Sequence, residues 1–135
     1  MKIVVCVKQV PDTADIKWTE QGTMIRDGVE SIMNPFDEYA VETALRIKDA
    51  NPGSTLTAVT MGPPQAKAVL KKAIAMGADD AILVSDKKFA GADTQATSRT
   101  LARAIKEKVG DFDVIVCGQF AIDGDTAQTG PSIAE

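Results

Sequence analysis

The sequence predicts an α/β fold, a doubly wound parallel sheet of Rossmann-like type with a small β-hairpin excursion. Four short apolar runs alternate with longer segments whose apolar residues recur at helical spacing. The apolar runs are nearly continuous rather than alternating, as expected for parallel strands that are covered on both faces. A polar segment with two glycines follows the last run, where open α/β sheets place their ligands. These three observations favour a βαβαβαβ order with right-handed crossovers.

The first apolar run, residues 2–7, is predicted to be the central strand. Pro11 then breaks the pattern, because proline cannot donate a hydrogen bond to a strand ladder. We interpret residues 10–13 as a turn, which either lies over a ligand or is a simple loop. Residues 15–28 are predicted to form the hairpin, with Gly22 at its turn.

The next segment has the features of a well-capped helix. Asn34 is a good N-cap and Pro35 suits the first helical position. Two carboxylates fall in the first turn, and the sequence Asn-Pro-Gly at residues 51–53 ends the helix. Capping alone accounts for these residues. The predicted buried face is Val41, Ala44, Leu45 and the stem of Lys48.

A strand at residues 55–61 and a proline-containing turn lead into a second helix. Its apolar residues follow the spacing i, i+3, i+4, i+7 and i+8, which predicts one buried stripe. The stripe consists of Ala66, Val69, Leu70, Ala73 and Ile74.

Residues 81–84 are predicted as a third strand, followed by a polar loop at residues 85–92. Asp93 or Thr94 is expected to cap the third helix. The buried stripe of that helix is predicted to be Leu101, Ala102, Ile105 and Val109.

The last strand is predicted over residues 112–117, and the polar segment after it opens another helix. Gly118 and Gly124 allow close backbone approach, and Thr126 is a plausible N-cap. Such a corner suits a phosphate, although an ordinary polar loop accounts equally well for the pattern, and two aspartates argue against a simple phosphate cradle. We expect residues 1–135 to be a single α/β domain that is truncated at its C-terminal end.

Composition excludes several classes of function. The chain has no histidine, which removes the usual general base and the common zinc sites. Cys6 and Cys117 lie in separate apolar runs, so we expect buried reduced thiols. A net charge of −4 makes nucleic acid an unsuitable partner, and no apolar stretch is long enough to predict a membrane span. We expect a cytoplasmic protein.

Three motifs, in order, resemble the β subunit of an electron transfer flavoprotein. They are the sequences VKQVPD at 7–12, MNPFDEYA at 33–40 and CGQFAIDGDTAQTGP at 117–131. The resemblance implies an electron carrier subunit, rather than an enzyme with acid–base chemistry of its own. It also implies that this chain binds FAD or AMP, with an α subunit as its heterodimer partner, and receives electrons from dehydrogenases or NADH.

The resemblance also implies the residues that contact the nucleotide, with no catalytic and no metal-binding residues. Phe36 is expected to lie towards the flavin of the α subunit. The implied contacts are Cys6, Asn34, Pro35, Phe36, Asp37, Met61, Gly118, Gln119, Phe120, Ala121, Ile122, Asp123, Gly124, Asp125, Thr126, Ala127, Gln128 and Thr129.

The form of residues 8–13 resembles that of electron-bifurcating members, in which NADH reduces a flavin held by the β subunit. This favours FAD over AMP. The alternative is a stand-alone module binding ATP or AMP, with the topology of universal stress proteins. Such a module would need glycine-rich phosphate motifs that the sequence lacks.

Overall fold

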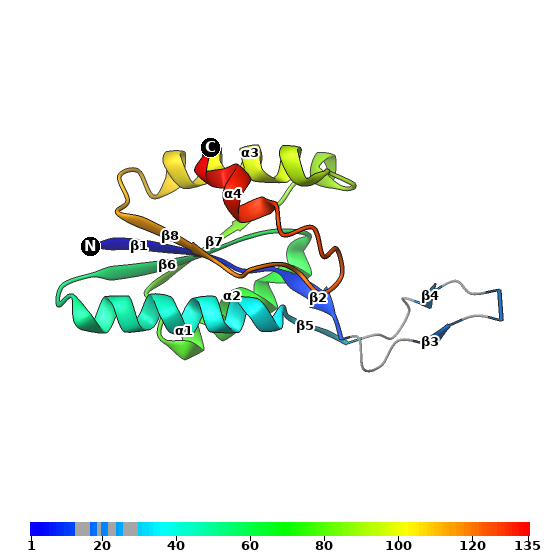
Figure 1. Cartoon of the computed structure of the whole chain (residues 1–135), viewed down its shortest axis with the longest axis horizontal. Helices are drawn as coiled ribbons and strands as arrows, with labels where there is room; N and C mark the ends of the chain where they lie inside the picture. Colours follow the sequence, from blue (N-terminus) through cyan, green and yellow to red (C-terminus); the bar gives the residue numbers. More distant parts are fainter. Residues whose placement is uncertain (13–16, 19, 22–23, 26–29) are drawn as a thin grey trace.

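The computed structural model of the chain describes residues 1–12, 17–18, 20–21, 24–25 and 30–135. Its centre is a parallel four-stranded sheet in the order β7-β6-β1-β8 (Figure 1). The strands are β1 (Lys2–Cys6), β6 (Thr55–Met61), β7 (Asp80–Val84) and β8 (Val114–Cys117). The predicted parallel sheet and the central position of β1 are confirmed, but the last strand begins at Val114 rather than at residue 112.

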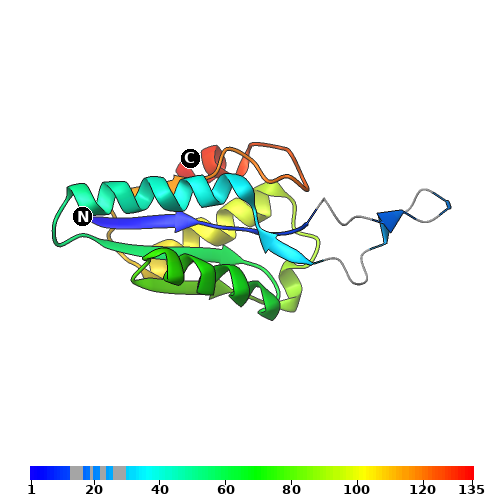
Figure 2. The same ribbon diagram turned by 90° about the horizontal axis from the view of Figure 1, so that it is seen from below.

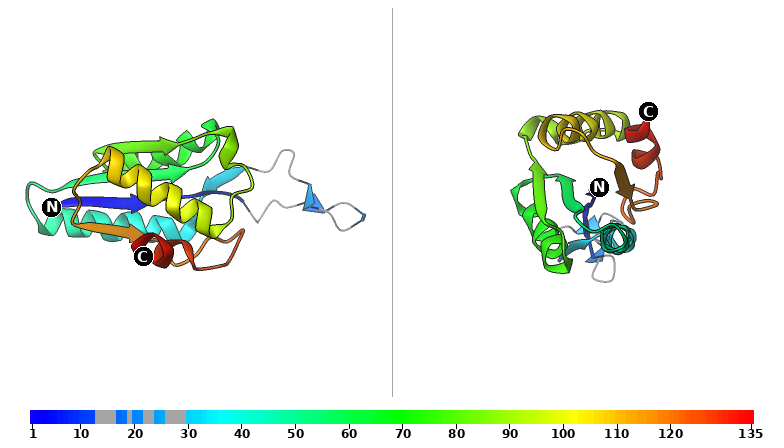
Figure 3. Two further views of the ribbon diagram at one scale, coloured as in Figure 1. Left: turned by 90° about the horizontal axis from the view of Figure 1, so that it is seen from above. Right: turned by 90° about the vertical axis from the view of Figure 1, so that its left-hand side faces the viewer.

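Two helices cover each face of the sheet, which confirms the doubly wound architecture. Helices α1 (Pro35–Ala50) and α2 (Lys67–Met76) lie on one face (Figure 2), and α3 (Thr94–Lys108) and α4 (Thr129–Ala134) lie on the other (Figure 3). The chain moves outward from β1 to β6 and β7, then returns to place β8 on the other side of β1. The carboxyl ends of the paired strands β1 and β8 therefore mark the topological switch point, where folds of this class bind ligands.

The sheet divides the core into two layers, and alternate residues of β1 enter opposite layers. Ile3 and Val5 pack with Val41 and Ala44 of α1, whereas Val4 packs with Leu101 and Ile105 of α3. Both faces of the strand are thus buried, which is the physical reason for its continuous apolar run.

The helical stripes agree with the predicted ones except at one position. Ala66, Val69, Leu70 and Ala73 are buried, but Ile74 is 42% exposed. Ala66 belongs to a short 3-10 turn, η2 (Pro64–Ala66), which precedes α2. The five-residue stripe therefore spans two elements, and the face that packs on the sheet is narrower than the apolar pattern indicates.

The interpretation of residues 10–13 as a turn is wrong at its start, because Val10 and Pro11 belong to a strand. Strand β2 (Gln9–Pro11) pairs antiparallel with β5 (Ser31–Met33), and Pro11 lies opposite Ser31. Among the described residues this sheet has two strands, so the absent proline N–H removes no interior ladder bond. The pair brings residues 7–12 next to the start of α1.

The predicted hairpin is confirmed where the structure describes it. Strands β3 (Lys17–Trp18) and β4 (Met24–Ile25) pair antiparallel. The other parts of residues 15–28, and Thr13 of the predicted turn, lie outside the described residues.

The predicted cap of the third helix is confirmed as Asp93, whose carboxylate accepts a hydrogen bond from the Ala96 N–H at 2.8 Å. A further 3-10 turn, η3 (Lys87–Phe89), lies in the preceding polar loop. Among the described residues, none of the helices has the length and apolar character that a membrane crossing requires.

Candidate functional site

A cleft of about 480 Å³ lies at the carboxyl ends of β1, β6 and β8. Its volume falls within the range of about 300–1,000 Å³ that small-molecule sites occupy. One wall is the segment between β8 and α4, which we call the cleft loop (residues 118–128), and the facing wall is the start of α3.

Most of the expected contact residues line this cleft. They are Cys6, Asn34, Asp37, Met61, Gly118, Gln119, Phe120, Ala121, Gly124, Asp125, Thr126, Ala127, Gln128 and Thr129. The four expected residues that do not line it are Pro35, Phe36, Ile122 and Asp123.

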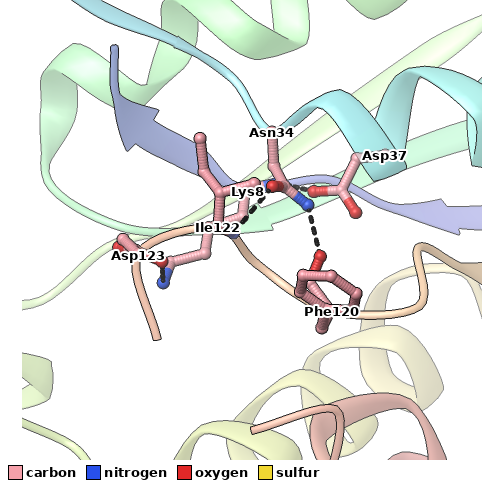
Figure 4. A network of polar contacts seen from close by, with 6 residues as sticks. All are labelled: Lys8, Asn34, Asp37, Phe120, Ile122 and Asp123. Carbon is pink, nitrogen blue, oxygen red and sulfur yellow. Dashed lines mark hydrogen bonds and ion pairs between the residues drawn. The ribbon is translucent and has the colours of Figure 1, made fainter. Parts of the chain in front are cut away.

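The side chain of Asn34 holds the cleft loop instead of capping α1. Its amide nitrogen donates to the carbonyl oxygen of Phe120 at 2.8 Å, and its amide oxygen accepts from the Ile122 N–H at 3.1 Å (Figure 4). Asn34 precedes α1, yet its side chain makes no cap hydrogen bond, so the interpretation that capping alone accounts for it is wrong. The side chain is 1% exposed, and it joins segments almost ninety positions apart in the sequence.

Two further contacts fasten the cleft loop to the rest of the domain. The Lys8 ammonium pairs with the Asp123 carboxylate at 2.7 Å (Figure 4). The rings of Phe36 and Phe120 lie 4.2 Å apart between centroids. Asp123 therefore holds the loop and does not line the cleft, which removes part of the objection that the loop aspartates raise against an anionic ligand.

Gly118 is the position where β8 passes close to the start of α1. A Cβ atom built on Gly118 would collide with the Asp37 carboxylate and would lie 2.9 Å from the Phe36 carbonyl carbon. The predicted need for glycine at this position is therefore confirmed. The close approach is to the protein's own helix.

Asp37 is a buried carboxylate at the junction of β1, α1 and the cleft loop. It accepts a hydrogen bond from the Lys8 N–H at 2.7 Å. Burial raises the pKa of Asp37 from 3.8 to about 6, although hydrogen bonds from the Lys8 N–H, the Asn34 side chain and the Gly118 N–H oppose the rise.

The second half of the cleft loop has a backbone that side-chain-bearing residues seldom adopt. Asp125 and Ala127 have φ angles of 52° and 54°, in the left-handed region. Helix α4 begins only at Thr129, after Gln128, so the prediction that Thr126 caps it is wrong. Backbone of this kind costs about 1–3 kcal/mol per residue, so it persists only where the surrounding structure holds it. Such residues cluster at ligand-binding and active sites.

The two cysteines both line the cleft. Cys6 and Cys117 are register partners on the neighbouring strands β1 and β8, and both are free. Their mutual hydrogen bond raises the pKa of the Cys6 thiol well above its usual value, and burial adds to the rise. The same interaction lowers the pKa of Cys117, although burial opposes the fall.

Helix α3 contributes residues to the cleft that were not predicted from the sequence. Asp93, Thr94 and Thr97, at the start of this helix, line the wall that faces the cleft loop. The sequence contained one signal for this wall, because Asp93 is a predicted helix cap that follows a strand. Its position beside the cleft loop, however, depends on the path of the chain from β7 through α3 to β8, which the sequence does not reveal. The other unpredicted lining residues are Val7, Lys8, Val59, Ala92, Leu101, Cys117 and Gly130.

The chemistry of the cleft fits an adenine nucleotide. Hydroxyl and amide side chains of Thr94, Thr97, Thr126, Gln128 and Thr129 line it, together with the apolar surfaces of β1 and β6. A Cβ on Gly124 would meet nothing within 4 Å, so this cleft-lining glycine leaves room that a side chain would fill. Donors, acceptors and apolar walls are therefore all present for a base, a ribose and phosphates.

Comparison with known proteins decides the family. The model of the electron transfer flavoprotein domain matches residues 21–135. The chain belongs to the electron transfer flavoprotein family. The resemblance to the β subunit that the three motifs indicate is thereby confirmed.

Three relatives show how far the likeness extends along the chain. The electron transfer flavoprotein subunit beta of Megasphaera elsdenii is 56% identical over 99% of this chain and 52% of its own length. Subunit CarD of the caffeyl-CoA reductase-Etf complex of Acetobacterium woodii is 57% identical over 100% of this chain and 52% of its own. The acryloyl-CoA reductase electron transfer subunit gamma of Anaerotignum propionicum is 51% identical over 100% and 51% respectively. The chain spans about half the length of these relatives.

Proposed function

We propose that this chain binds an adenine nucleotide in the cleft at the carboxyl ends of β1 and β8, as part of the β subunit of a heterodimeric electron carrier. The observation that carries the proposal is the position of the cleft, at the switch point of the sheet, in a member of the electron transfer flavoprotein family. FAD is the proposed occupant and AMP the alternative.

The residues of the cleft divide into two roles. The cleft-lining members of residues 118–129, with Cys6, Met61 and the start of α3, contact the nucleotide. Asn34, Asp37, Phe36 and Asp123 fix the cleft loop through their contacts with its backbone and side chains, and Pro35 fixes the start of α1. A bound flavin would supply the capacity to accept a hydride and pass on electrons, while the chain's own residues bind and orient it.

We infer that the subunit works with an α subunit, with dehydrogenases as electron donors and, in an electron-bifurcating version, with NADH. The form of residues 8–13 in the sequence supports that version. Two of the relatives carry names of a reductase complex subunit and a reductase electron transfer subunit, which supports a role in passing electrons to or from a partner enzyme. The cytoplasmic location stays a prediction. Family membership favours this function over that of a stand-alone ATP- or AMP-binding module.

The substitution Gly124→Val tests the assignment of the cleft. Its side chain has room in the protein, because a Cβ at Gly124 meets nothing within 4 Å and Gly124 does not have a positive φ. We expect unchanged stability and loss of FAD and AMP binding in titration calorimetry. The matched control is Ala75→Val on the exposed surface of α2, which should leave binding unchanged. Full affinity in the Gly124→Val variant would contradict the proposal.

A further inference from the structure

Cys6 and Cys117 are the only cysteines of the chain, and the fold places them side by side. Each is the last residue of its strand, each is half-buried, and both line the cleft. They come from positions 111 residues apart in the sequence, so only the parallel pairing of β1 with β8 brings the two thiols together.

Register pairing fixes how the two side chains are arranged. Both pack against the layer of core that contains Leu101 and Ile105, so they leave the sheet on the same face. Neighbouring strands are about 4.7–4.9 Å apart. A single atom held between the sulfurs, with bonds of about 2.3 Å, spans the gap with the strands in place.

The ionisation of the pair suits such an atom. The Cys6 S–H lowers the pKa of Cys117, and the thiolate is the form of cysteine that attacks electrophiles and binds soft atoms. Once the first sulfur is bonded, the second is held beside it at a high effective concentration.

We propose that Cys6 and Cys117 form a dithiol site that binds one thiophilic atom, such as the arsenic of a trivalent arsenical, between both sulfurs. With phenylarsine oxide, two As–S bonds form and the two S–H bonds break. The arsenical oxygen leaves with both protons as water, and arsenic stays trivalent, so no oxidant or reductant is needed. Because both thiols line the cleft, the arsenical and a nucleotide should exclude each other; this clause rests on the function proposed above.

Phenylarsine oxide and a count of free thiols test the site in the 135-residue chain. We expect one phenylarsine per chain by native mass spectrometry, with both thiols lost to a thiol-specific dye at one equivalent. A small dithiol should release the arsenical, and an equal concentration of a monothiol should not. The variants Cys6→Ser and Cys117→Ser should each bind at least about 100-fold more weakly, since one sulfur is lost.

Two phenylarsines per chain, or one thiol that still reacts with the dye at saturation, would overturn the dithiol site. Because the thiol count is made on the unsubstituted chain, it holds even if a serine variant folds poorly. FAD or AMP should slow the reaction. If the nucleotide bound without slowing the reaction, only the proposed competition would be wrong. If the nucleotide did not bind at all, the proposed function would be contradicted, and the dithiol site would still stand.

Discussion

At the residue scale, the site depends on two positions that look ordinary in the sequence. Gly118 belongs to a glycine-containing loop, and Asp37 lies in the acidic first turn of a helix. In the fold they touch, since a side chain on Gly118 would overlap the Asp37 carboxylate. Both residues therefore serve the junction between β8 and α1, and this junction sets the position of the cleft loop.

The substitution Gly118→Ala should destabilise the domain. The new methyl group meets backbone atoms of Phe36 and Asp37 that cannot move aside as a flexible side chain could. We expect a loss of about 1–3 kcal/mol in the free energy of unfolding, measured with urea. Gly124→Ala is the matched control, and it should stay within about 0.5 kcal/mol of the parent, because the site is open. Equal stability of the two variants would refute the close approach.

Asp37 predicts a specific pH dependence. The folded state holds the proton up to about pH 6, whereas the unfolded chain releases it near 3.8, so the folded state binds more protons between these values. The contribution of Asp37 to stability is therefore greatest below about pH 4 and declines as the pH rises through 6. The whole decline amounts to about 3 kcal/mol.

The difference in unfolding free energy between the parent chain and Asp37→Asn isolates this contribution. As the pH rises from 4 to 7, the parent should lose stability relative to the variant, which cannot ionise at that position. Any constant offset from a changed hydrogen bond is removed by comparing pH values. A difference that stays flat over this range would show that the folded and unfolded pKa values of Asp37 are alike.

At the element scale, α1 and α3 both follow a good N-cap residue, but only one of these residues caps its helix. Asp93 caps α3 with its carboxylate, as its sequence position predicts. Asn34 stands at the corresponding place before α1, yet its amide bonds the cleft loop. Local sequence could not distinguish these cases, because both residues are good N-caps. The partners of Asn34 lie almost ninety residues away and are set by the fold.

The substitution Asn34→Ala should therefore loosen the cleft loop rather than the helix. It leaves the Phe120 carbonyl and the Ile122 N–H without their partner, at a cost of about 1–3 kcal/mol. We expect faster amide hydrogen exchange at Ile122, with little change at the start of α1.

Asp93→Ala is the matched control for this experiment. It removes a side-chain cap, so faster exchange should appear at Ala96 in α3, and the cleft loop should be unaffected. If Asn34→Ala accelerated exchange in the first turn of α1 and not at Ile122, Asn34 would act as an ordinary helix cap and not as the residue that holds the cleft loop.

At the scale of the whole molecule, sequence pattern was sufficient for the sheet and insufficient for the wall of the cleft. Continuous apolar runs predict buried parallel strands because both faces are covered. This held for β1 and β6, whereas β8 is only half-buried along its length. The β2–β5 pair escaped prediction because Pro11 is unfavourable only inside a wider sheet. Thr94, Thr97 and the pairing of Cys6 with Cys117 could not be predicted, since each depends on where a crossover returns the chain.

We propose that the nucleotide lies at the switch point formed by the carboxyl ends of β1 and β8. Backbone amide NMR of the 135-residue chain, titrated with FAD and separately with AMP, measures this most directly. We expect saturable shifts in residues 117–130, at the end of β1 and at the start of α3, with little change on the exposed surfaces of α1 and α2. Shifts centred on α1 and α2, with the cleft loop unchanged, would contradict it.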